Sequence, residues 1–348
     1  MTVQPSVTVV IVNLDGAAFL PECLDSLEVQ EYPRDLVTVL VVDNGSTDGS
    51  VSLLETRYPW VGVLAQKTNI GFAPAVNVGA RAATGECLVF LNNDTRVDPR
   101  FLAELTRAYA PSESVMAVGA RIVSWDGSEL DFFEGGTGLD GMASQIGYGS
   151  PARLTEGAGD RELLFACGGA MLIGRQTYLE IGGFDDRFFA YFEDVDLGWR
   201  MHVQGLRVVG APGAVAYHRM HGTSARFPFH KRVFLYERNA LLCLIKNIEH
   251  RHLDDVLLTA VLLAVTRTAV RGRLSPRMFD IRESGPGADT MSLPMTALAP
   301  VAGIVDVLDN LDDILDARRT VQAGRRVPDA EVLPLLGRTF WPAMTDRG

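Results

Sequence analysis

The chain has 348 residues, of which 47% are hydrophobic and 22% are charged, as in a globular protein large enough for a catalytic core and a helical extension. Its formal net charge of −11 argues against nucleic acid as a bulk partner, because binding to phosphate backbones requires a basic surface. Its 4 cysteines lie far apart without a CxxC spacing, which disfavours a zinc knuckle or a redox pair and indicates free thiols in a reducing compartment.

The sequence gives no sign of export or of a membrane span. No basic residues precede an apolar run at the start of the chain, so a secretory signal is not expected. The longest apolar stretch, residues 256–265, is too short to cross a bilayer as a helix. We therefore expect a cytoplasmic protein, and contact with the inner face of the cell membrane stays open.

The first part of the chain alternates between strand-like and helix-like patterns. Apolar, β-prone runs predict four strands, at residues 6–12, 36–42, 61–66 and 87–91. Apolar residues at helical spacing predict the intervening helices, at residues 17–29, 50–58 and 72–83. This βαβαβαβ order predicts an α/β fold with a mostly parallel sheet and right-handed crossovers.

The rest of the chain predicts a loop-rich middle and a helical end. Further strands are predicted at residues 117–124, 165–174 and 206–217, and helices at 193–203, 232–248, 253–270 and 301–321. Residues 125–160 are rich in glycine, serine and aspartate, which predicts a long loop that is either functional or disordered. We therefore predict an α/β domain at residues 1–228 and a C-terminal helical region at residues 229–348.

The predicted strand at residues 87–91 ends abruptly at Asn92, Asn93 and Asp94. Ligands of open α/β sheets bind at the carboxyl ends of the strands, so these side chains are candidates for a site. Asp94 is a hard oxygen donor, suited to a divalent cation that holds a phosphate. The alternative interpretation is that residues 92–95 only cap the helix after Pro99.

Two other strand ends carry polar side chains. Asp43 follows the second predicted strand and is placed to accept hydrogen bonds from a base or a ribose. Asn69, Gly71 and Asn77 follow the third, where the glycine permits close backbone approach and a helix N-terminus could face phosphate. In both places, turn and capping chemistry alone is the alternative.

Three carboxylates, Glu193, Asp194 and Asp196, follow an aromatic cluster at a predicted helix start. The helix dipole favours one or two acids there, but it explains three less well, because crowded like charges raise their proton affinity. One of these carboxylates is therefore a candidate general base. Asp196 and Arg200 are spaced to form an ion pair along the helix.

Two histidines, His218 and His221, follow the strand predicted at residues 206–217. A histidine paired with a distant aspartate suits manganese or magnesium, although a lone histidine is more often structural. No HExxH zinc motif is present. The sequence also lacks the G-x-G-x-x-G, Walker A and G-x-S-x-G motifs, which disfavours a Rossmann dehydrogenase, a P-loop NTPase and a serine hydrolase.

Taken together and in order, these segments resemble an inverting glycosyltransferase of family 2 with the GT-A fold. The segments that carry the resemblance are residues 10–13, 41–48, 69–79, 91–94 and 192–194. Within that family, the chain is most similar to the bacterial rhamnosyltransferase-like branch, whose members build cell-surface polysaccharides. The resemblance extends over roughly residues 6–250, so it implies a GT-A sheet with flanking helices and leaves the C-terminal region unassigned.

The resemblance implies a role for each matching residue. The nucleotide-sugar contacts would be Asn13, Asp43, Asn69, Gly71, Asn77, Asn92 and Asn93. Asp94 and His218 would be the metal ligands, for Mn²⁺ or Mg²⁺, and Asp194 would be the general base. The acceptor side would include Gly168, Gly169, Glu193 and Trp199. Asn92 stands where the family's Asp-x-Asp motif has an acid, so we expect weak metal affinity and a cation that arrives mainly with the donor.

The implied reaction is a single displacement. A sugar would move from a nucleotide-diphosphate donor to a hydroxyl of a glycan or lipid-linked acceptor, and the donor would be a UDP- or dTDP-sugar, with dTDP-rhamnose among the candidates. One alternative is a nucleotidyltransferase, which would have a glycine-rich basic loop where residues 13–16 stand. Another is a non-catalytic scaffold of a polysaccharide assembly complex, which the presence of Asp94, Asp194 and His218 disfavours.

The C-terminal helices allow two interpretations. Four arginines flank the apolar helix predicted at residues 253–270, namely Arg267, Arg271, Arg273 and Arg277. They could hold the helix against an anionic membrane as a peripheral contact beside a lipid-linked acceptor. The favoured interpretation is packing, either in a homodimer or against the catalytic domain.

Overall fold

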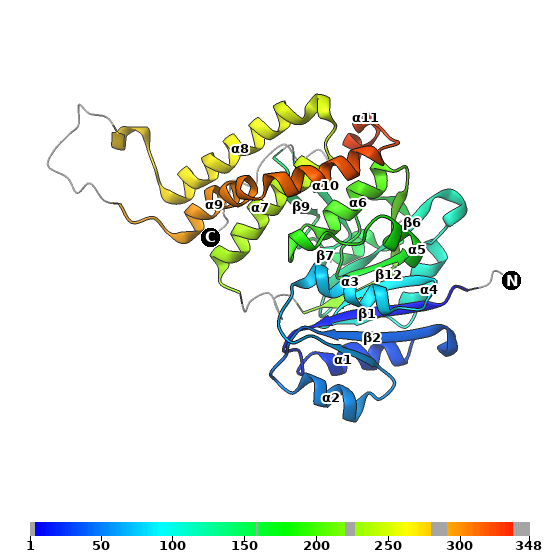
Figure 1. The fold of residues 1–348 in the computed structure, drawn as a ribbon. Helices are drawn as coiled ribbons and strands as arrows, with labels where there is room; N and C mark the ends of the chain where they lie inside the picture. The colour runs from blue at the N-terminus through cyan, green and yellow to red at the C-terminus, as the bar shows by residue number, and fades with distance from the viewer. Residues whose placement is uncertain (1–3, 139, 158, 220–226, 280–290, 337–348) are drawn as a thin grey trace. The chain divides into compact units, whose positions relative to one another are not determined.

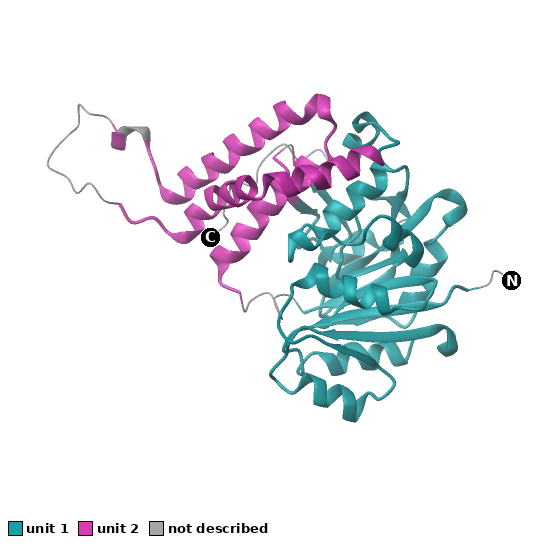
Figure 2. Cartoon of the chain, viewed as in Figure 1, with its two compact units in different colours: residues 1–136, 144–224, 325–337 teal, residues 137–143, 225–324, 338–348 magenta. Residues whose placement is uncertain are grey.

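The structure is a computed structural model that describes residues 4–138, 140–157, 159–219, 227–279 and 291–336 (Figure 1). The chain forms two compact units (Figure 2). The first comprises residues 1–136, 144–224 and 325–337, and the second residues 137–143, 225–324 and 338–348. This division differs from the predicted one, because residues 325–337 rejoin the first unit and residues 137–143 join the second. The amides of Arg326 and Val327 explain the former, since both donate to the Val203 carbonyl.

The first unit is built on a ten-stranded sheet of order β10-β12-β6-β11-β4-β1-β2-β3. The two remaining strands branch from this order, with β5 paired to β12 and β7 paired to β6. Its parallel half consists of β1 (Val7–Asn13), β2 (Val37–Asp43), β3 (Gly62–Ala65) and β4 (Cys87–Asn92). The register places Asn13 beside Asp43 and Val12 beside Asn92, so the polar ends of three strands lie side by side. The predicted α/β fold with a mostly parallel sheet is confirmed.

The other half of the sheet is mixed. Its long strands are β6 (Val115–Ser124), β11 (Ala170–Gly174) and β12 (Arg207–His218). Strand β11 lies antiparallel between β4 and β6, whereas β12 runs parallel to β6. Strand β11 begins at Ala170, later than predicted, because residues 163–169 form other contacts: the Leu163 amide donates to the Val208 carbonyl and the Gly168 amide donates to Asp194.

The segment predicted as a long loop, residues 125–160, contains short strands. They are β7 (Leu130–Phe132), β8 (Glu134–Thr137) and β9 (Ala143–Ile146). Two more short strands, β5 (Thr95–Val97) and β10 (Arg161–Glu162), pair with β12, and β7 pairs with β6. The prediction of an irregular loop is therefore wrong for much of this segment, because strands of 3 or 4 residues are too short to show a clear period.

Helices cover the sheet of the first unit. They are α1 (Leu20–Glu28), α2 (Ser50–Arg57), α3 (Phe72–Ala82), α4 (Phe101–Ala108), α5 (Arg175–Glu180), α6 (Glu193–Val203) and α11 (Asp329–Val332). Helix α1 buries Leu20, Cys23, Leu24 and Leu27, the spacing of one helical face. Helix α3 approaches β1 closely at Gly79, where a Cβ would lie 2.3 Å from the Val10 side chain.

Helix α6 depends on a glycine at its closest contact. A Cβ at Gly198 would lie 2.4 Å from the Leu164 carbonyl oxygen and 2.7 Å from the Phe165 Cα, and backbone atoms cannot turn away as a side chain can. We expect Gly198→Ala to lower the free energy of unfolding by about 1–3 kcal/mol, measured by denaturant titration. The matched control is Gly159→Ala, where a Cβ would meet nothing within 4 Å. Equal stability of the two variants would contradict this account of α6 packing.

The second unit is helical. It contains α7 (Phe229–Asn247), α8 (His250–Gly272), α9 (Met295–Asp309) and α10 (Leu311–Ala323). The single helix predicted at residues 301–321 is therefore wrong: it starts earlier and breaks at Asn310, whose backbone leaves the helical region at φ −110° and ψ 18°. The Asn310 side-chain amide donates to the Asp306 carbonyl, a local bond that competes with the helical one.

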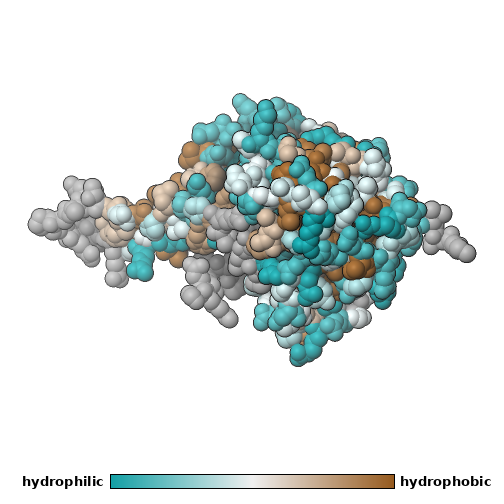
Figure 3. Space-filling view, turned by 90° about the horizontal axis from the view of Figure 1, so that it is seen from below, coloured by the Kyte–Doolittle hydropathy of each residue, from teal (hydrophilic) through white to brown (hydrophobic). Residues whose placement is uncertain are grey.

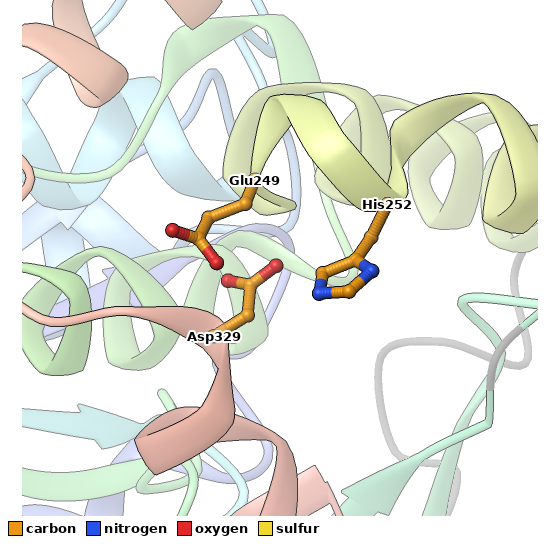
Figure 4. A group of neighbouring side chains, drawn as sticks. All are labelled: Glu249, His252 and Asp329. Atoms are coloured by element: carbon orange, nitrogen blue, oxygen red, sulfur yellow. The ribbon is translucent and has the colours of Figure 1, made fainter.

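Ion pairs join the helices of the second unit. Glu237 of α7 is buried and accepts from Arg267 at 2.7 Å and from Arg271 at 3.0 Å, and Arg267 also donates to Asp140 at 2.9 Å. Arg267 and Arg271, two of the four arginines considered as membrane contacts, therefore form ion pairs within this unit. Glu249 and His252 lie at the start of α8, and Glu249 accepts from Arg251 (Figure 4).

Asp329 begins α11 of the first unit and accepts from Arg325 at 2.9 Å. Among the helices that the structure describes, none is long and apolar enough to cross a membrane.

Candidate functional site

The carboxyl ends of β1, β2 and β4 share a hydrogen-bond network. The side-chain amide of Asn13 donates to the Asp43 carboxylate at 3.0 Å, and the side-chain amide of Asn93 donates to the side-chain oxygen of Asn13 at 2.8 Å. Asp43 also accepts from the Ser46 backbone amide at 3.0 Å. All three predicted residues are buried, so their side chains are fixed in place before any ligand arrives. The network joins three strand ends in one rigid polar surface.

Asp94 and His218 come together although they are far apart in sequence. Strand β5 follows Asp94 and pairs with the end of β12, and this register sets Thr95 opposite His218. The His218 Nε2 lies 3.3 Å from an Asp94 carboxylate oxygen. The Arg219 amide donates to the Asp94 carbonyl at 3.0 Å, which holds the two segments together. His221, the second predicted histidine, lies outside the described residues.

Asp131 completes this group, and the sequence analysis did not single it out. Its carboxylate lies 2.6 Å from the His218 Nδ1, on the side of the ring opposite Asp94. Asp131 lies in β7, where the pairing with β6 has a register irregularity. The one signal in the sequence is a carboxylate between Leu130 and Phe132, both buried and apolar.

The Asp94–His218–Asp131 group has the donor chemistry of a divalent cation site. Burial opposes the charge of His218, but its hydrogen bonds to Asp131 and Asp94 outweigh that effect and raise its pKa to about 10. The ring is therefore protonated at neutral pH without a cation, and a cation would have to displace the proton from Nε2. A histidine that ligates a metal through one nitrogen usually donates the other to a carboxylate, which is the place Asp131 occupies. Asp94 supplies a hard oxygen and His218 Nε2 an imidazole nitrogen, a mixed set that suits Mn²⁺ or Mg²⁺.

Asp194 is held at the start of α6 by two backbone amides. One carboxylate oxygen accepts from the Gly168 amide at 3.0 Å, and the other accepts from the Val195 amide at 2.8 Å. Burial raises the pKa of Asp194, and these two hydrogen bonds offset only part of the increase. The result is an oriented carboxylate with raised proton affinity, which suits a general base.

Glu193 is the neighbour of Asp194 and has a different environment. Burial and the negative charge of Asp194 raise the pKa of Glu193 well above its ordinary value. One of its carboxyl oxygens is buried without a hydrogen-bond partner among the described residues, which disfavours a charge on that oxygen. The Asp194 carboxylate, by contrast, has a place among backbone amides, because each of its two oxygens accepts a hydrogen bond.

Gly168 and Gly169 connect Asp194 to the end of β4, two residues before Asp94. The backbone amide of Asn92 donates to the Gly169 carbonyl at 2.9 Å. A Cβ at Gly169 would lie 2.7 Å from the Asn92 side chain. Gly168, the next residue, donates to Asp194. This contact brings the candidate base beside the polar end of β4.

The backbone amides at the start of α3 are bonded to another part of the chain. The Phe72 and Ala73 amides both donate to the Phe189 carbonyl, at 2.6 and 3.2 Å, which corrects the expectation that this helix N-terminus faces phosphate. Gly71 has φ +98°, and a Cβ there would lie 2.7 Å from the Phe189 oxygen, so only glycine fits. Asn69 is exposed, and its side-chain oxygen accepts from the Gly71 amide at 2.9 Å.

The segment before α6 has an unusual backbone. Phe189, Tyr191 and Phe192 have φ values of 60°, 70° and 72°, the left-handed region that residues other than glycine rarely adopt. Such conformations persist where surrounding structure imposes them, often beside functional groups. Here they immediately precede Glu193 and Asp194.

Two predicted contacts are corrected by their surroundings. Trp199 is 1% exposed in the core, so it cannot present a surface to an acceptor. Asn77 donates to the Phe184 carbonyl and to Asp186, and its oxygen accepts from the Tyr178 hydroxyl. Both ends of its amide are thus used to order residues 184–186, which replaces its predicted contact with the donor.

A cationic and aromatic group beside Asp94 was also missed. Arg96 lies 4.8 Å from the centre of the Trp125 ring, and Arg219 lies 4.1 Å from it, so one indole is stacked with two guanidinium groups. Arg219 also pairs with Glu22. The predicted ion pair of Asp196 and Arg200 is present at 2.7 Å and buried.

Comparison with known proteins gives a consistent result. The family model described as glycosyl transferase family 2 matches residues 8–181. The N-acetylglucosaminyl-diphospho-decaprenol L-rhamnosyltransferase of Mycobacterium tuberculosis is 32% identical over 238 residues, which cover 62% of this chain and 76% of that protein. The O-antigen biosynthesis protein RfbC of Myxococcus xanthus is 34% identical over 215 residues, which cover 59% of this chain and 16% of that protein.

Solved structures share the fold. GalNAc-T7, solved with UDP, GalNAc and Mn²⁺, superposes with a TM-score of 0.56 at 16% identity over 70% of this chain and 48% of its own. The mannosyltransferase PcManGT from Pyrobaculum calidifontis, solved with GDP-Man and Mn²⁺, superposes with a TM-score of 0.51 at 20% identity over 92% of this chain and 88% of its own. At these identities the likeness establishes the GT-A fold alone.

Proposed function

Since this chain belongs to glycosyl transferase family 2 and is therefore a glycosyltransferase acting on nucleotide-sugar donors, we propose that it transfers the sugar with inversion and with the help of a divalent cation. The observation that carries the proposal is the contact of Asn92 with Gly169, because it links the segment that binds Asp194 to the end of β4, two residues before Asp94. This link supports a site in which the base and the cation would lie on either side of the donor and the acceptor.

The donor nucleotide is assigned to the joined ends of β1, β2 and β4. Asp43 and Asn13 would contact the base and ribose, with Asn69 and Gly71 at the edge of the same surface. Asn92 and Asn93 would contact ribose or sugar without adding charge. The rigid bonds between Asn13, Asp43 and Asn93 support this assignment, because preorganised polar groups lose little freedom on binding.

Asp94 and His218 would hold the cation, and Asp131 would orient the His218 ring. When bound, a divalent cation neutralises charge on the diphosphate leaving group. Support comes from the short contacts among these three side chains and from two proteins of the same fold that were solved with Mn²⁺. The bond that Asp131 makes to Nδ1 leaves Nε2 directed at Asp94, which is the orientation a metal ligand needs.

Asp194 would remove the proton of the acceptor hydroxyl. The hydroxyl oxygen attacks the anomeric carbon from the face opposite the diphosphate, the bond to the diphosphate breaks, and the proton passes to an Asp194 oxygen. One displacement inverts the configuration at that carbon. The amides of Gly168 and Val195 fix the carboxylate in one orientation, which favours proton transfer to a single position.

We infer the substrate class from the relatives. The M. tuberculosis relative is named for L-rhamnosyl transfer to a diphospho-decaprenol acceptor, and the M. xanthus relative for O-antigen biosynthesis. A UDP- or dTDP-sugar such as dTDP-rhamnose, and a lipid-linked glycan of a cell-surface polysaccharide, are the substrates to test first. Thermal-shift screening of nucleotide sugars with Mn²⁺ should identify the donor. Failure of every nucleotide sugar to stabilise the chain or to turn over would contradict the proposal.

The pH dependence of transfer should report the raised pKa of Asp194. The base works only when it is deprotonated, so activity should rise with pH through a pKa above the ordinary value of 3.8 and then level off. The measurement is the initial rate against pH at saturating Mn²⁺ and donor, with Glu193→Gln as the control that should keep this limb. A rate that stays constant down to the ordinary aspartate range would contradict the assignment.

A further inference from the structure

Three helix ends meet at one end of the second unit. Arg271, near the end of α8, pairs with Glu237 in the first half of α7. A Cβ at Gly272 would lie 3.2 Å from Leu293 and 3.6 Å from Ala297, so the start of α9 lies there as well. Figure 1 shows these ends on the same side of the helical unit. We call this region, residues 227–236, 266–279 and 291–298, the basic end.

The basic end exposes large apolar side chains. Phe279 is 76% exposed and Phe229 is 63% exposed. Val270, Met278, Met291 and Met295 are at least half exposed as well. In Figure 3, tan and brown apolar residues lie at the surface on the left, where Figure 2 draws the second unit. A concentration of large exposed apolar side chains at one end of a folded unit is typical of an interaction site.

The charge of the basic end is opposite to that of the chain. The whole protein has a formal charge of −11, yet the three described segments of the basic end contain no aspartate or glutamate; Asp280, Glu283 and Asp289 lie in residues 280–290, between two of them and outside the described residues. Their basic residues are Lys231, Arg232, Arg267, Arg271, Arg273 and Arg277. The nearest acid along α7, Glu237, is buried and neutralised by Arg267 and Arg271. The exposed charges, such as Lys231 and Arg273, are therefore positive.

We propose that the basic end is a peripheral docking surface for an anionic lipid bilayer. Aromatic and methionine side chains would enter the headgroup boundary, while lysine and arginine side chains contact lipid phosphates. A second copy of the chain fits less well, because a symmetric contact through this surface would place like charges against each other. The surface belongs to the second unit, and the proposal does not rest on the proposed base, metal or donor.

Vesicle flotation of the full chain tests the proposal. The chain should float with vesicles of phosphatidylcholine and phosphatidylglycerol, and less at high salt, but not with phosphatidylcholine alone. Since each basic residue near the surface contributes about fivefold in partitioning, Lys231→Glu with Arg273→Glu should reduce binding by more than tenfold. Phe279→Ser with Phe229→Ser should reduce it through lost apolar burial.

Matched controls lie in the first unit. Lys67→Glu changes an exposed lysine, and Val29→Ser changes an apolar side chain that is 62% exposed; neither should alter flotation. Unchanged thermal stability and donor turnover would show that the basic-end variants are folded. Equal binding to neutral and anionic vesicles, or no binding, would overturn the proposal. So would a concentration-dependent dimer that forms through Phe279 in place of vesicle binding.

Discussion

Replacement of Asp194 by asparagine is expected to lower sugar transfer by about 10²–10⁴-fold while nucleotide binding survives. Asparagine keeps the shape of the side chain and can still accept one backbone hydrogen bond, but it cannot take up the acceptor proton. The proposed donor contacts Asn13, Asp43 and Asn93 lie at the ends of β1, β2 and β4, and the bonds that join them do not involve Asp194. The measurements are the rate of product formation and the calorimetric affinity for the donor nucleotide in the presence of Mn²⁺.

Two further variants make this expectation specific. Asp35→Asn changes an exposed aspartate that is distant from Asp194 in the sequence, and it should leave the rate unchanged. Glu193→Gln removes a carboxyl group that has no proposed role in proton transfer and whose pKa is raised well above the ordinary value, so it should cost less than Asp194→Asn. Transfer at the wild-type rate by Asp194→Asn would refute the base assignment, and a larger loss in Glu193→Gln would exchange the two roles.

The strand ends of the candidate site could be predicted because their signal is local. A valine-rich run that stops at a polar cluster marks both the strand and the place where it ends, as at Asp43 and Asp94. The order of strands then brings those ends together, and the observed register of β1 with β2 and β4 follows from it. Helix α6 was likewise predicted with its observed bounds, because carboxylates at its start and buried residues along its length mark it clearly.

What the sequence could not predict depends on contacts between distant segments. Asp131 reaches His218 only because β7 folds onto β6 and β6 pairs with β12, and no local pattern specifies those pairings. The roles of Asn77 and Trp199 were misassigned for the same reason. Both lie within conspicuous segments, but their side chains turn into the core, and only the packing of residues 178–186 and of α6 decides that.

The second large effect concerns the cation site. Asp131→Asn should weaken Mn²⁺-dependent nucleotide binding by about 10–100-fold, the usual cost of removing the partner that orients a metal-ligating histidine. Asp94→Asn and His218→Ala each remove a proposed ligand and should cost at least as much. The measurement is calorimetry of nucleoside diphosphate binding with and without Mn²⁺. Asp126→Asn is the matched control, since that carboxylate is exposed and bonds only to nearby serines among the described residues.

Metal-independent nucleotide binding separates loss of a ligand from loss of the fold. It should be the same in all these variants, because Asn13 is bonded to both Asp43 and Asn93, and neither of these bonds involves Asp94 or His218. Metal dependence that is unchanged in Asp94→Asn and His218→Ala would refute the ligand assignment.

Asn92 has an amide in place of a carboxylate, and this leads to a further prediction about Mn²⁺ affinity. A site with one carboxylate fewer should bind Mn²⁺ weakly on its own and much more tightly once a diphosphate adds its oxygens and charge. Thermodynamic linkage requires the same factor in the other direction, so Mn²⁺ should strengthen nucleotide binding by as much as nucleotide strengthens Mn²⁺ binding. Asn92→Asp should raise the affinity for Mn²⁺ alone and reduce this coupling. Tight binding of Mn²⁺ to the unliganded wild-type chain would contradict a cation that arrives with the donor.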